Sequence, residues 1–122
     1  MSARSLLEQY EKQINTHDFK DVSTFISEDA IFWFSNGSYE GISAIKAAFE
    51  KTWALIQEET YWLSDIKWLS DNLESAACVY TFHWKGKISG NMREGSGRGT
   101  SVLQKQNGGW KIVHEHLSNF PI

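Results

Sequence analysis

The chain has 122 residues and a formal net charge of −3, and it is rich in aromatic side chains, with six Trp, seven Phe and four Tyr. This length suits one domain over residues 1–122, and the small negative charge lacks the basic face of nucleic-acid-binding proteins, so no nucleic-acid partner is expected. A single cysteine, Cys78, no visible secretory leader and no apolar run of membrane-spanning length predict a cytoplasmic protein without a membrane partner.

The first two predicted elements are helices. Apolar residues recur at helical spacing between residues 2 and 14, at Leu6, Leu7, Tyr10 and Ile14. Ser2 or Ser5 is the expected cap of this helix. After a break at residues 15–18, Asp18 is expected to cap a short second helix, whose inward residues are Phe19, Val22, Phe25 and Ile26.

A short hairpin and a third helix come next. Residues 30–34 are apolar at both parities, which predicts a covered strand, and Asn36-Gly37 predicts a turn into a return strand over residues 38–40. After Gly41 the helical pattern is the clearest in the chain, with Ser43 as the expected cap. Its apolar stripe consists of Ile45, Ala48, Phe49, Thr52, Trp53 and Ile56.

The rest of the chain predicts a sheet. Strands are expected over residues 61–69 and 75–87, followed by a flexible glycine-rich connection over residues 89–97 and a terminal hairpin. Helical segments precede the long strands, and βαβ alternation is absent. The expected class is therefore α+β with an antiparallel sheet.

The terminal hairpin provides the main functional prediction. Asn107-Gly108 separates two alternating runs, residues 99–106 and 110–118, and is the strongest short-range hairpin signal. Simple alternation places one set of side chains on a single face, namely Trp110, Ile112, His114, His116 and Ser118. The register then puts Leu103 opposite Ile112 and Ser101 opposite His114, which is the pattern of a pocket floor.

The opposite face of the hairpin predicts a protein interface. It would carry a mixture of apolar and polar side chains, namely Arg98, Thr100, Val102, Val113, Glu115 and Leu117. Such a mixture suits a homodimer formed through the outer face of the sheet. The alternative is a set of scattered surface apolar residues, which are normal on monomers.

These features resemble the nuclear-transport-factor-2-like superfamily and, within it, the SnoaL-like group. The resemblance covers nearly the whole chain and is carried by residues 10–18, 27–30, 41–45 and, most specifically, 108–118. It implies a cone-shaped α+β barrel in which three helical segments pack on the concave face of a curved antiparallel sheet, with a pocket open at one end and a dimer through the outer face. It implies no single function, because this fold hosts several chemistries and also binding domains.

The ketosteroid isomerases of this superfamily match only in part. Tyr10 stands eight residues before Asp18, similar to the oxyanion tyrosine of those enzymes. Phe34 falls at the position of their general base, Ser101 near their second acid, and Phe49 where a supporting tyrosine would be. Because a phenyl ring cannot abstract a proton, that machinery is not expected. The kinase-association domains of the superfamily share the pattern of His114 and His116 but carry an arginine near Ser101 that this chain lacks.

Several side chains are candidates for a site. His114 is the candidate general base, assisted by Tyr10, because an imidazole titrates near neutral pH. The ligand-binding candidates are Trp33, Tyr39, Phe49, Trp53, Ser101, His116 and Arg98. The alternatives are that His114 and His116 are hydrogen-bonded framework residues, and that Arg98 forms a surface ion pair. A metal would need a third ligand from His83, Asp29 or Glu115, and no metal or cofactor is expected.

Two functions follow from these candidates. The first is a pocket that binds a small organic ligand, with weak acid–base chemistry of the isomerase, lyase or cyclase type at His114. The second is a non-catalytic homodimeric association or stress-related binding module, in which Trp and Phe side chains fill the pocket. An open cavity favours the first function, and a filled one favours the second.

Overall fold

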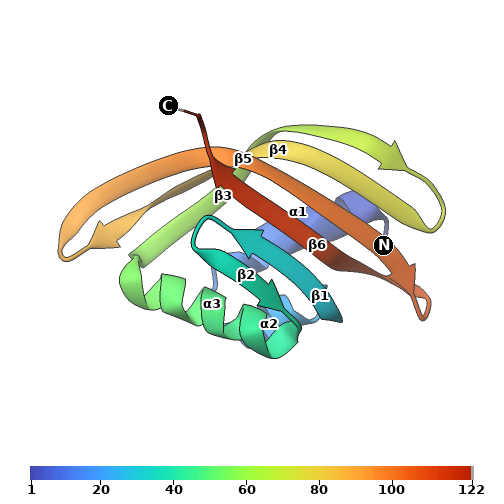
Figure 1. The fold of residues 1–122 in the computed structure, drawn as a ribbon, viewed down its shortest axis with the longest axis horizontal. Helices are drawn as coiled ribbons and strands as arrows, with labels where there is room; N and C mark the ends of the chain where they lie inside the picture. Colours follow the sequence, from blue (N-terminus) through green and yellow to red (C-terminus); the bar gives the residue numbers. More distant parts are fainter. Residues whose placement is uncertain (122) are drawn as a thin grey trace.

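The structure is a computed structural model that describes residues 1–121, and it consists of three helices and a six-stranded curved, unclosed sheet (Figure 1). The elements are α1 (Ala3–Ile14), α2 (Phe19–Ser23), β1 (Ile26–Phe34), β2 (Gly37–Glu40), α3 (Ile42–Leu55), β3 (Gln57–Asp71), β4 (Ser75–Ile88), β5 (Asn91–Gln106) and β6 (Gly109–Asn119). The predicted α+β class is confirmed. None of the described helices is long and apolar enough to span a bilayer.

The sheet has the strand order β2-β1-β6-β5-β4-β3, and the helices gather along its concave side (Figure 1). All neighbouring strands are antiparallel except β1 and β6, which pair in parallel. The expectation of a purely antiparallel sheet is therefore wrong at this one pair. The two strands come from opposite ends of the chain, so no hairpin determines their relative direction.

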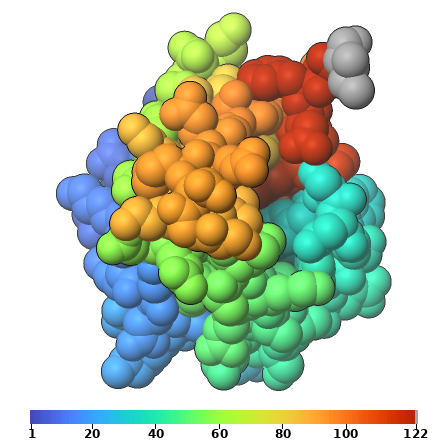
Figure 2. All heavy atoms as spheres, turned by 90° about the vertical axis from the view of Figure 1, so that its left-hand side faces the viewer, coloured from blue at the N-terminus to red at the C-terminus, as the bar shows by residue number. Residues whose placement is uncertain are grey.

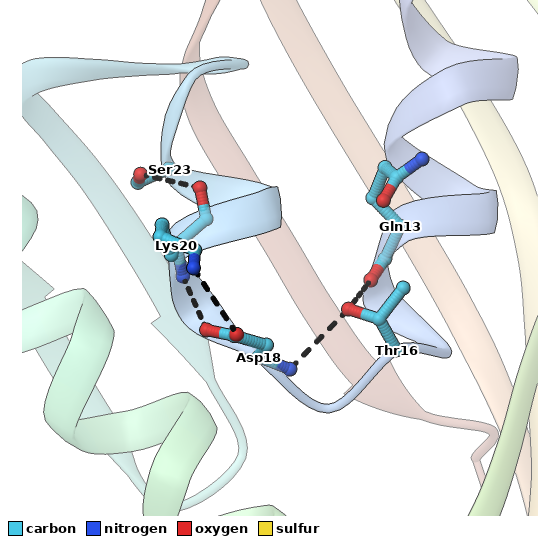
Figure 3. Close-up of polar contacts among 5 residues, drawn as sticks. All are labelled: Gln13, Thr16, Asp18, Lys20 and Ser23. Atoms are coloured by element: carbon cyan, nitrogen blue, oxygen red, sulfur yellow. Dashed lines mark hydrogen bonds and ion pairs between the residues drawn. The ribbon is translucent and has the colours of Figure 1, made fainter.

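Local side-chain bonds begin α1 and α2. The Ser2 hydroxyl accepts a hydrogen bond from the Ser5 amide, and the Asp18 carboxylate accepts one from the Lys20 amide at 3.0 Å (Figure 3). Asp18 was the predicted cap of α2, and Ser2 was one of the two residues, with Ser5, expected to cap α1. The predicted Ser43 cap of α3 is wrong, because Gly41 is the N-cap residue and has no side chain that could cap the helix. The positive φ of Gly41, 86°, turns the chain directly from β2 into α3.

The glycine-rich segment is a strand and not a loop. The β4–β5 hairpin turns at Ser89 and Gly90, both at positive φ, and β5 then continues through the glycines. Gly95, Gly97 and Gly99 lie on the concave face, where aromatic rings of β4 cover them. A Cβ atom at Gly97 would lie 2.2 Å from the Ser118 carbonyl oxygen, so the backbone approach requires glycine there.

A bulge in the β5–β6 hairpin reverses the predicted faces. Leu103 pairs with Ile112 as predicted, but Val102 pairs with His114, which leaves Val113 as the extra residue. Ser101 consequently lies opposite Glu115 and not opposite His114. Since one inserted residue changes the side-chain parity, Glu115 and Leu117 turn inward.

Candidate functional site

A cavity of about 370 Å³ lies at one end of the molecule, between the helices and the sheet. Its walls come from α3, the start of β3, β4, the end of β6 and the turn between β1 and β2. Figure 2 shows this end, where α3 (green), the β4–β5 hairpin (yellow to orange), the end of β6 (red) and the β1–β2 hairpin (cyan) come together. A volume of about 300–1,000 Å³ is typical of small-molecule sites.

Glu115 is the first carboxyl group of the cavity. It is only 2% exposed, and its Oε1 accepts a hydrogen bond from the Tyr10 hydroxyl at 3.1 Å. Burial raises the pKa of Glu115 to about 8, and the Tyr10 hydrogen bond partly opposes that rise. The carboxyl group is therefore mostly protonated at neutral pH and can donate a proton or a hydrogen bond.

Glu59 is the second carboxyl group of the cavity. The preceding Glu58 has a positive φ of 56°, in the irregular stretch where the β3–β4 register shifts. Glu59 is 8% exposed, and within residues 1–121 its carboxylate forms no hydrogen bond or ion pair with another residue. Its oxygens keep contact with the open cavity, since none of the fully buried side-chain oxygens among the described residues lacks a partner. Burial raises the pKa of Glu59 to about 7, so the group is close to half-ionised at neutral pH.

Gly86 explains how Glu59 comes so close to β4. A Cβ atom at Gly86 would lie 3.1 Å from the Glu59 Cα and 2.5 Å from the Ile56 Cγ2. Only glycine allows the start of β3 to pack this tightly against β4, and this packing holds Glu59 at the cavity wall.

Aromatic rings form most of the remaining wall. The lining includes Phe34, Phe49, Trp53, Tyr61, Phe82 and Trp84. Phe49 packs on Trp53 with a centroid distance of 5.5 Å, and Tyr61 stacks on Phe82 at 6.3 Å. The rings leave the cavity open, and they surround the two carboxyl groups with apolar surface.

Two hydrogen bonds of buried hydroxyl groups support the cavity wall. Tyr10 lies on α1, is buried, and reaches the cavity only through Glu115. Ser101 is buried and bonds to the Tyr80 hydroxyl at 2.8 Å. Tyr10 therefore positions Glu115, and Ser101 belongs to the framework beneath the cavity floor.

Of the candidate ligand-binding residues, Phe49 and Trp53 lie in the cavity wall. Tyr39 packs on Phe34 at 5.6 Å and donates a hydrogen bond to Asn36 Oδ1, so it supports the β1–β2 hairpin beside the cavity. The spacing of the α3 stripe was sufficient to place Phe49 and Trp53, because helical periodicity is not disturbed there.

Four other candidates lie on the outer face of the sheet. The Trp33 ring, 44% exposed, meets the rings of His114 and His116 edge-on at 4.9 and 5.4 Å. His114 Nδ1 lies 2.7 Å from the Ile31 carbonyl oxygen, and Arg98 lines an outer depression together with His116. The prediction that these histidines face the pocket is wrong, because the bulge at Val113 reverses their direction.

The residues considered for a metal site lie apart. His83 stacks on Trp62 and bonds to Ser64, whereas Asp29 accepts a hydrogen bond from Ser27. In the part of the chain that the structure describes, no three His, Cys, Asp or Glu side chains form a group that could hold a metal ion.

The sequence reasoning missed both Glu59 and Glu115 as site residues. For Glu115 the adjacent apolar pair Ile112-Val113 was the available signal, since two neighbouring apolar residues on an alternating strand can mark a bulge. For Glu59 no comparable signal exists, because Glu58 and Glu59 are identical residues and only the backbone decides which one is buried.

Solved structures that are similar to this chain share its fold at low sequence identity. A nuclear transport factor 2 (NTF2-like) superfamily protein from Salmonella enterica serovar Typhimurium has 21% identity and a TM-score of 0.87, with 97% of this chain and 88% of that chain covered. A candidate aromatic ring hydroxylase from Novosphingobium aromaticivorans has 17% identity and a TM-score of 0.86, with 99% and 88% covered. A candidate calcium/calmodulin-dependent protein kinase II association domain from Xanthomonas campestris has 18% identity and a TM-score of 0.84, with 97% and 85% covered.

At these identities the similarity shows the fold alone. No curated protein matches the sequence significantly. The SnoaL-like domain family matches residues 3–122, nearly the whole chain. This family and fold suggest a ligand-binding or small-molecule-processing domain. The chain belongs to the SnoaL-like family and has the NTF2-like fold.

Proposed function

We propose that this protein binds a small, largely apolar organic molecule in the aromatic cavity and transfers protons to and from it with Glu59 and Glu115. The observation that carries the proposal is the position of two buried carboxyl groups in the lining of one open cavity of about 370 Å³. These carboxyl groups replace the histidine that the sequence suggested.

The two carboxyl groups suit different roles. Glu59, with a pKa near 7, is partly ionised and can accept a proton from a carbon next to a carbonyl group. Glu115, with a pKa near 8, is mostly neutral and can donate a hydrogen bond to that carbonyl oxygen. While Glu59 holds the proton, this proton can exchange with solvent, and return of a solvent proton to the same carbon gives exchange. Where the ligand carries a double bond conjugated with the enolate, return of the proton to the far end of that system gives isomerisation.

Proton exchange in a cyclic ketone tests this chemistry. In D₂O the wild-type protein should accelerate the exchange of the α-protons of 2-tetralone, measured by NMR. Glu59→Gln and Glu115→Gln should each reduce the acceleration at least tenfold, since the usual contribution of general acid–base catalysis is larger than this, about 10²–10⁴. Glu58→Gln is the matched control, since Glu58 is exposed and pairs with Lys87. Exchange at the buffer rate with wild-type protein would exclude the proton-transfer role.

A cavity-filling variant tests binding separately from chemistry. Ala48 lies in the cavity wall, and the adjacent Ala47 is on the exposed side of α3. Ala48→Phe should abolish the binding of 2-naphthol, measured by titration calorimetry, whereas Ala47→Phe should leave it unchanged. Equal binding by the two variants would place the ligand outside this cavity.

The outer face of the sheet supports a second proposal, a homodimer. Its exposed Trp33, Ile31 and Trp62 are large apolar residues on one sheet surface, and a second copy would cover them. Trp33→Glu should then reduce the mass measured by sedimentation to that of a monomer. Leu73→Glu, at the exposed β3–β4 turn, is the control and should leave the measured mass unchanged. A monomeric wild-type protein would exclude this proposal without affecting the cavity.

A further inference from the structure

The ionisable side chains that line the cavity are acidic, and none of them is basic. Glu59 and Glu115 are its ionisable carboxyl groups, and no Lys, Arg or His among the described residues lines it. The ion pairs recorded in residues 1–121 join other, exposed side chains. Glu115 has a Tyr10 hydrogen bond, but the carboxylate of Glu59 has no cation beside it.

An anionic ligand would be repelled in this cavity. Two buried carboxyl groups in apolar surroundings would face the added negative charge with little solvent to screen it, and Coulomb interactions are strong at low dielectric constant. A neutral ligand avoids this repulsion, but it leaves Glu59 either buried without a countercharge or protonated.

A cation would satisfy both features of the wall. Ammonium groups are attracted to the faces of Trp and Tyr rings, and this cavity contains Trp53, Tyr61 and Trp84 together with the two carboxyl groups. Tyr61, Glu59 and Glu115 line the same cavity. An ammonium group over the Tyr61 ring would therefore lie near both carboxyl groups, and its charge would favour their ionised forms.

We propose that the ligand of this cavity is a hydrophobic amine, bound as an ammonium ion by Glu59, Glu115 and the aromatic wall. The inference rests on the proposed function only in taking the same cavity as the binding site. It adds the chemical class of the ligand, which is an apolar body bearing one positive charge.

The groups around the carboxyls support a cation-linked release of protons. Tyr10, Tyr61, Tyr80 and Cys78 are the titratable groups that face Glu115, and none of them can supply a positive charge, because a phenol or a thiol is neutral when protonated. Burial raises the pKa of all four, which keeps them neutral. His17 contacts the backbone of Glu59, with its Nε2 atom 2.8 Å from the Glu59 carbonyl oxygen. The His17 ring stacks on Trp53 and is not part of the cavity lining. A bound ammonium ion should therefore lower the pKa values of Glu59 and Glu115 and release protons.

Three probes with the same phenyl ring and a similar chain test the proposal. They are 3-phenylpropylamine, which is cationic at pH 7, 3-phenyl-1-propanol, which is neutral, and 3-phenylpropanoate, which is anionic. Titration calorimetry at pH 7 should give at least tenfold tighter binding for the amine than for the alcohol, and the weakest binding for the carboxylate. Titrations of the amine in two buffers of different ionisation enthalpy should show proton release.

Variants assign the preference to the carboxyl groups. Glu59→Gln and Glu115→Gln should each reduce the affinity for the amine at least fivefold and leave the affinity for the alcohol unchanged. The Gln amide is close in shape to the protonated carboxyl group of Glu, so the substitutions change little besides the charge. Thermal melts monitored by circular dichroism check that the variants fold. Glu58→Gln should retain the full preference for the amine, because Glu58 faces solvent beside Lys87.

The outcomes separate this inference from the proposed function. Alcohol binding equal to or tighter than amine binding would overturn the inference and leave the apolar cavity as a ligand site. An amine preference that survives in both Gln variants would also overturn it, since the cation would then bind elsewhere. If none of the three probes and no 2-naphthol bound, the proposed function would fail as well.

Discussion

The two faces of β6 carry different chemistry on the same 11-residue strand. Toward the helices, Glu115 lies in an apolar cavity, nearly inaccessible to solvent, and its pKa is raised to about 8. Toward the outside, His114 and His116 surround the exposed Trp33. One extra residue, Val113, determines which set faces the cavity. Residue type alone therefore did not identify the catalytic candidates. The imidazoles of His114 and His116 are the better acid–base groups in isolation, and yet they face away from the cavity.

The largest expected effect concerns the space available on each face. Gly97→Val would force a side chain against the Ser118 carbonyl and the Phe82 ring on the concave face, and it should reduce the free energy of unfolding by about 3 kcal/mol or more. Ser96→Val, one residue away on the outer face, should change it by less than about 0.5 kcal/mol. Urea denaturation measures both variants, and similar losses would show that the two faces are equally crowded.

A second prediction concerns pH. The pKa values of Glu59 and Glu115 in the folded protein, about 7 and 8, lie above the ordinary value of 4.5. Between pH 4.5 and these raised values, the folded state therefore binds more protons than the unfolded state. The contribution of these groups is therefore fully present below pH 4.5 and is lost as the pH rises through 7 and 8. At about 1.4 kcal/mol per pKa unit, the loss between pH 5 and pH 9 should amount to several kcal/mol.

Glu115→Gln sharpens this prediction. The amide keeps an acceptor oxygen for Tyr10 but cannot ionise, so the variant should be more stable than the wild type at pH 9 and should show a flatter pH dependence. Urea denaturation at pH 5, 7 and 9 measures the slopes. Glu58→Gln should retain the wild-type slope, and an unchanged slope in Glu115→Gln would contradict the burial of a titrating group at this position.

A third, smaller effect is expected from the hydroxyl of Tyr10. Tyr10→Phe removes the hydrogen bond to Glu115 and should destabilise the protein by about 1–2 kcal/mol near neutral pH. It should also raise the pKa of Glu115 further, because the lost bond favours the ionised form, and the fall in stability should extend to higher pH. Tyr39→Phe is the control for the loss of a hydroxyl group, because the Tyr39 hydroxyl donates to Asn36 and not to Glu59 or Glu115.

The smallest effect is expected on the outer face. His114→Ala should leave ketone exchange and 2-naphthol binding unchanged, and should reduce the free energy of unfolding by less than about 1 kcal/mol, since it removes one contact to Ile31 and one to Trp33. A loss of exchange in His114→Ala, measured by the same NMR assay, would restore the histidine as a participant and refute the assignment of the two faces.

Most of the fold could be predicted from local signals. Helical spacing located all three helices, Asp18 was identified as a cap, and Asn107-Gly108 located the terminal turn. These signals depend on residues that are neighbours in the sequence. The parallel pairing of β1 with β6 was missed because it joins strands from opposite ends of the chain, and no local pattern states their relative direction.

Local patterns in the amino-acid sequence were enough to predict the α+β class, the SnoaL-like resemblance and the helix residues Phe49 and Trp53, because helical periodicity and turn chemistry act over a few residues. That Glu115 faces the cavity, and that Glu59 and not Glu58 is buried, follows from the folded arrangement of the chain. A bulge or a single residue at positive φ reverses side-chain parity. The energy that selects such a local feature comes from packing against distant elements, such as the Tyr10 hydrogen bond and the close approach at Gly86, and this packing exists only once the chain has folded.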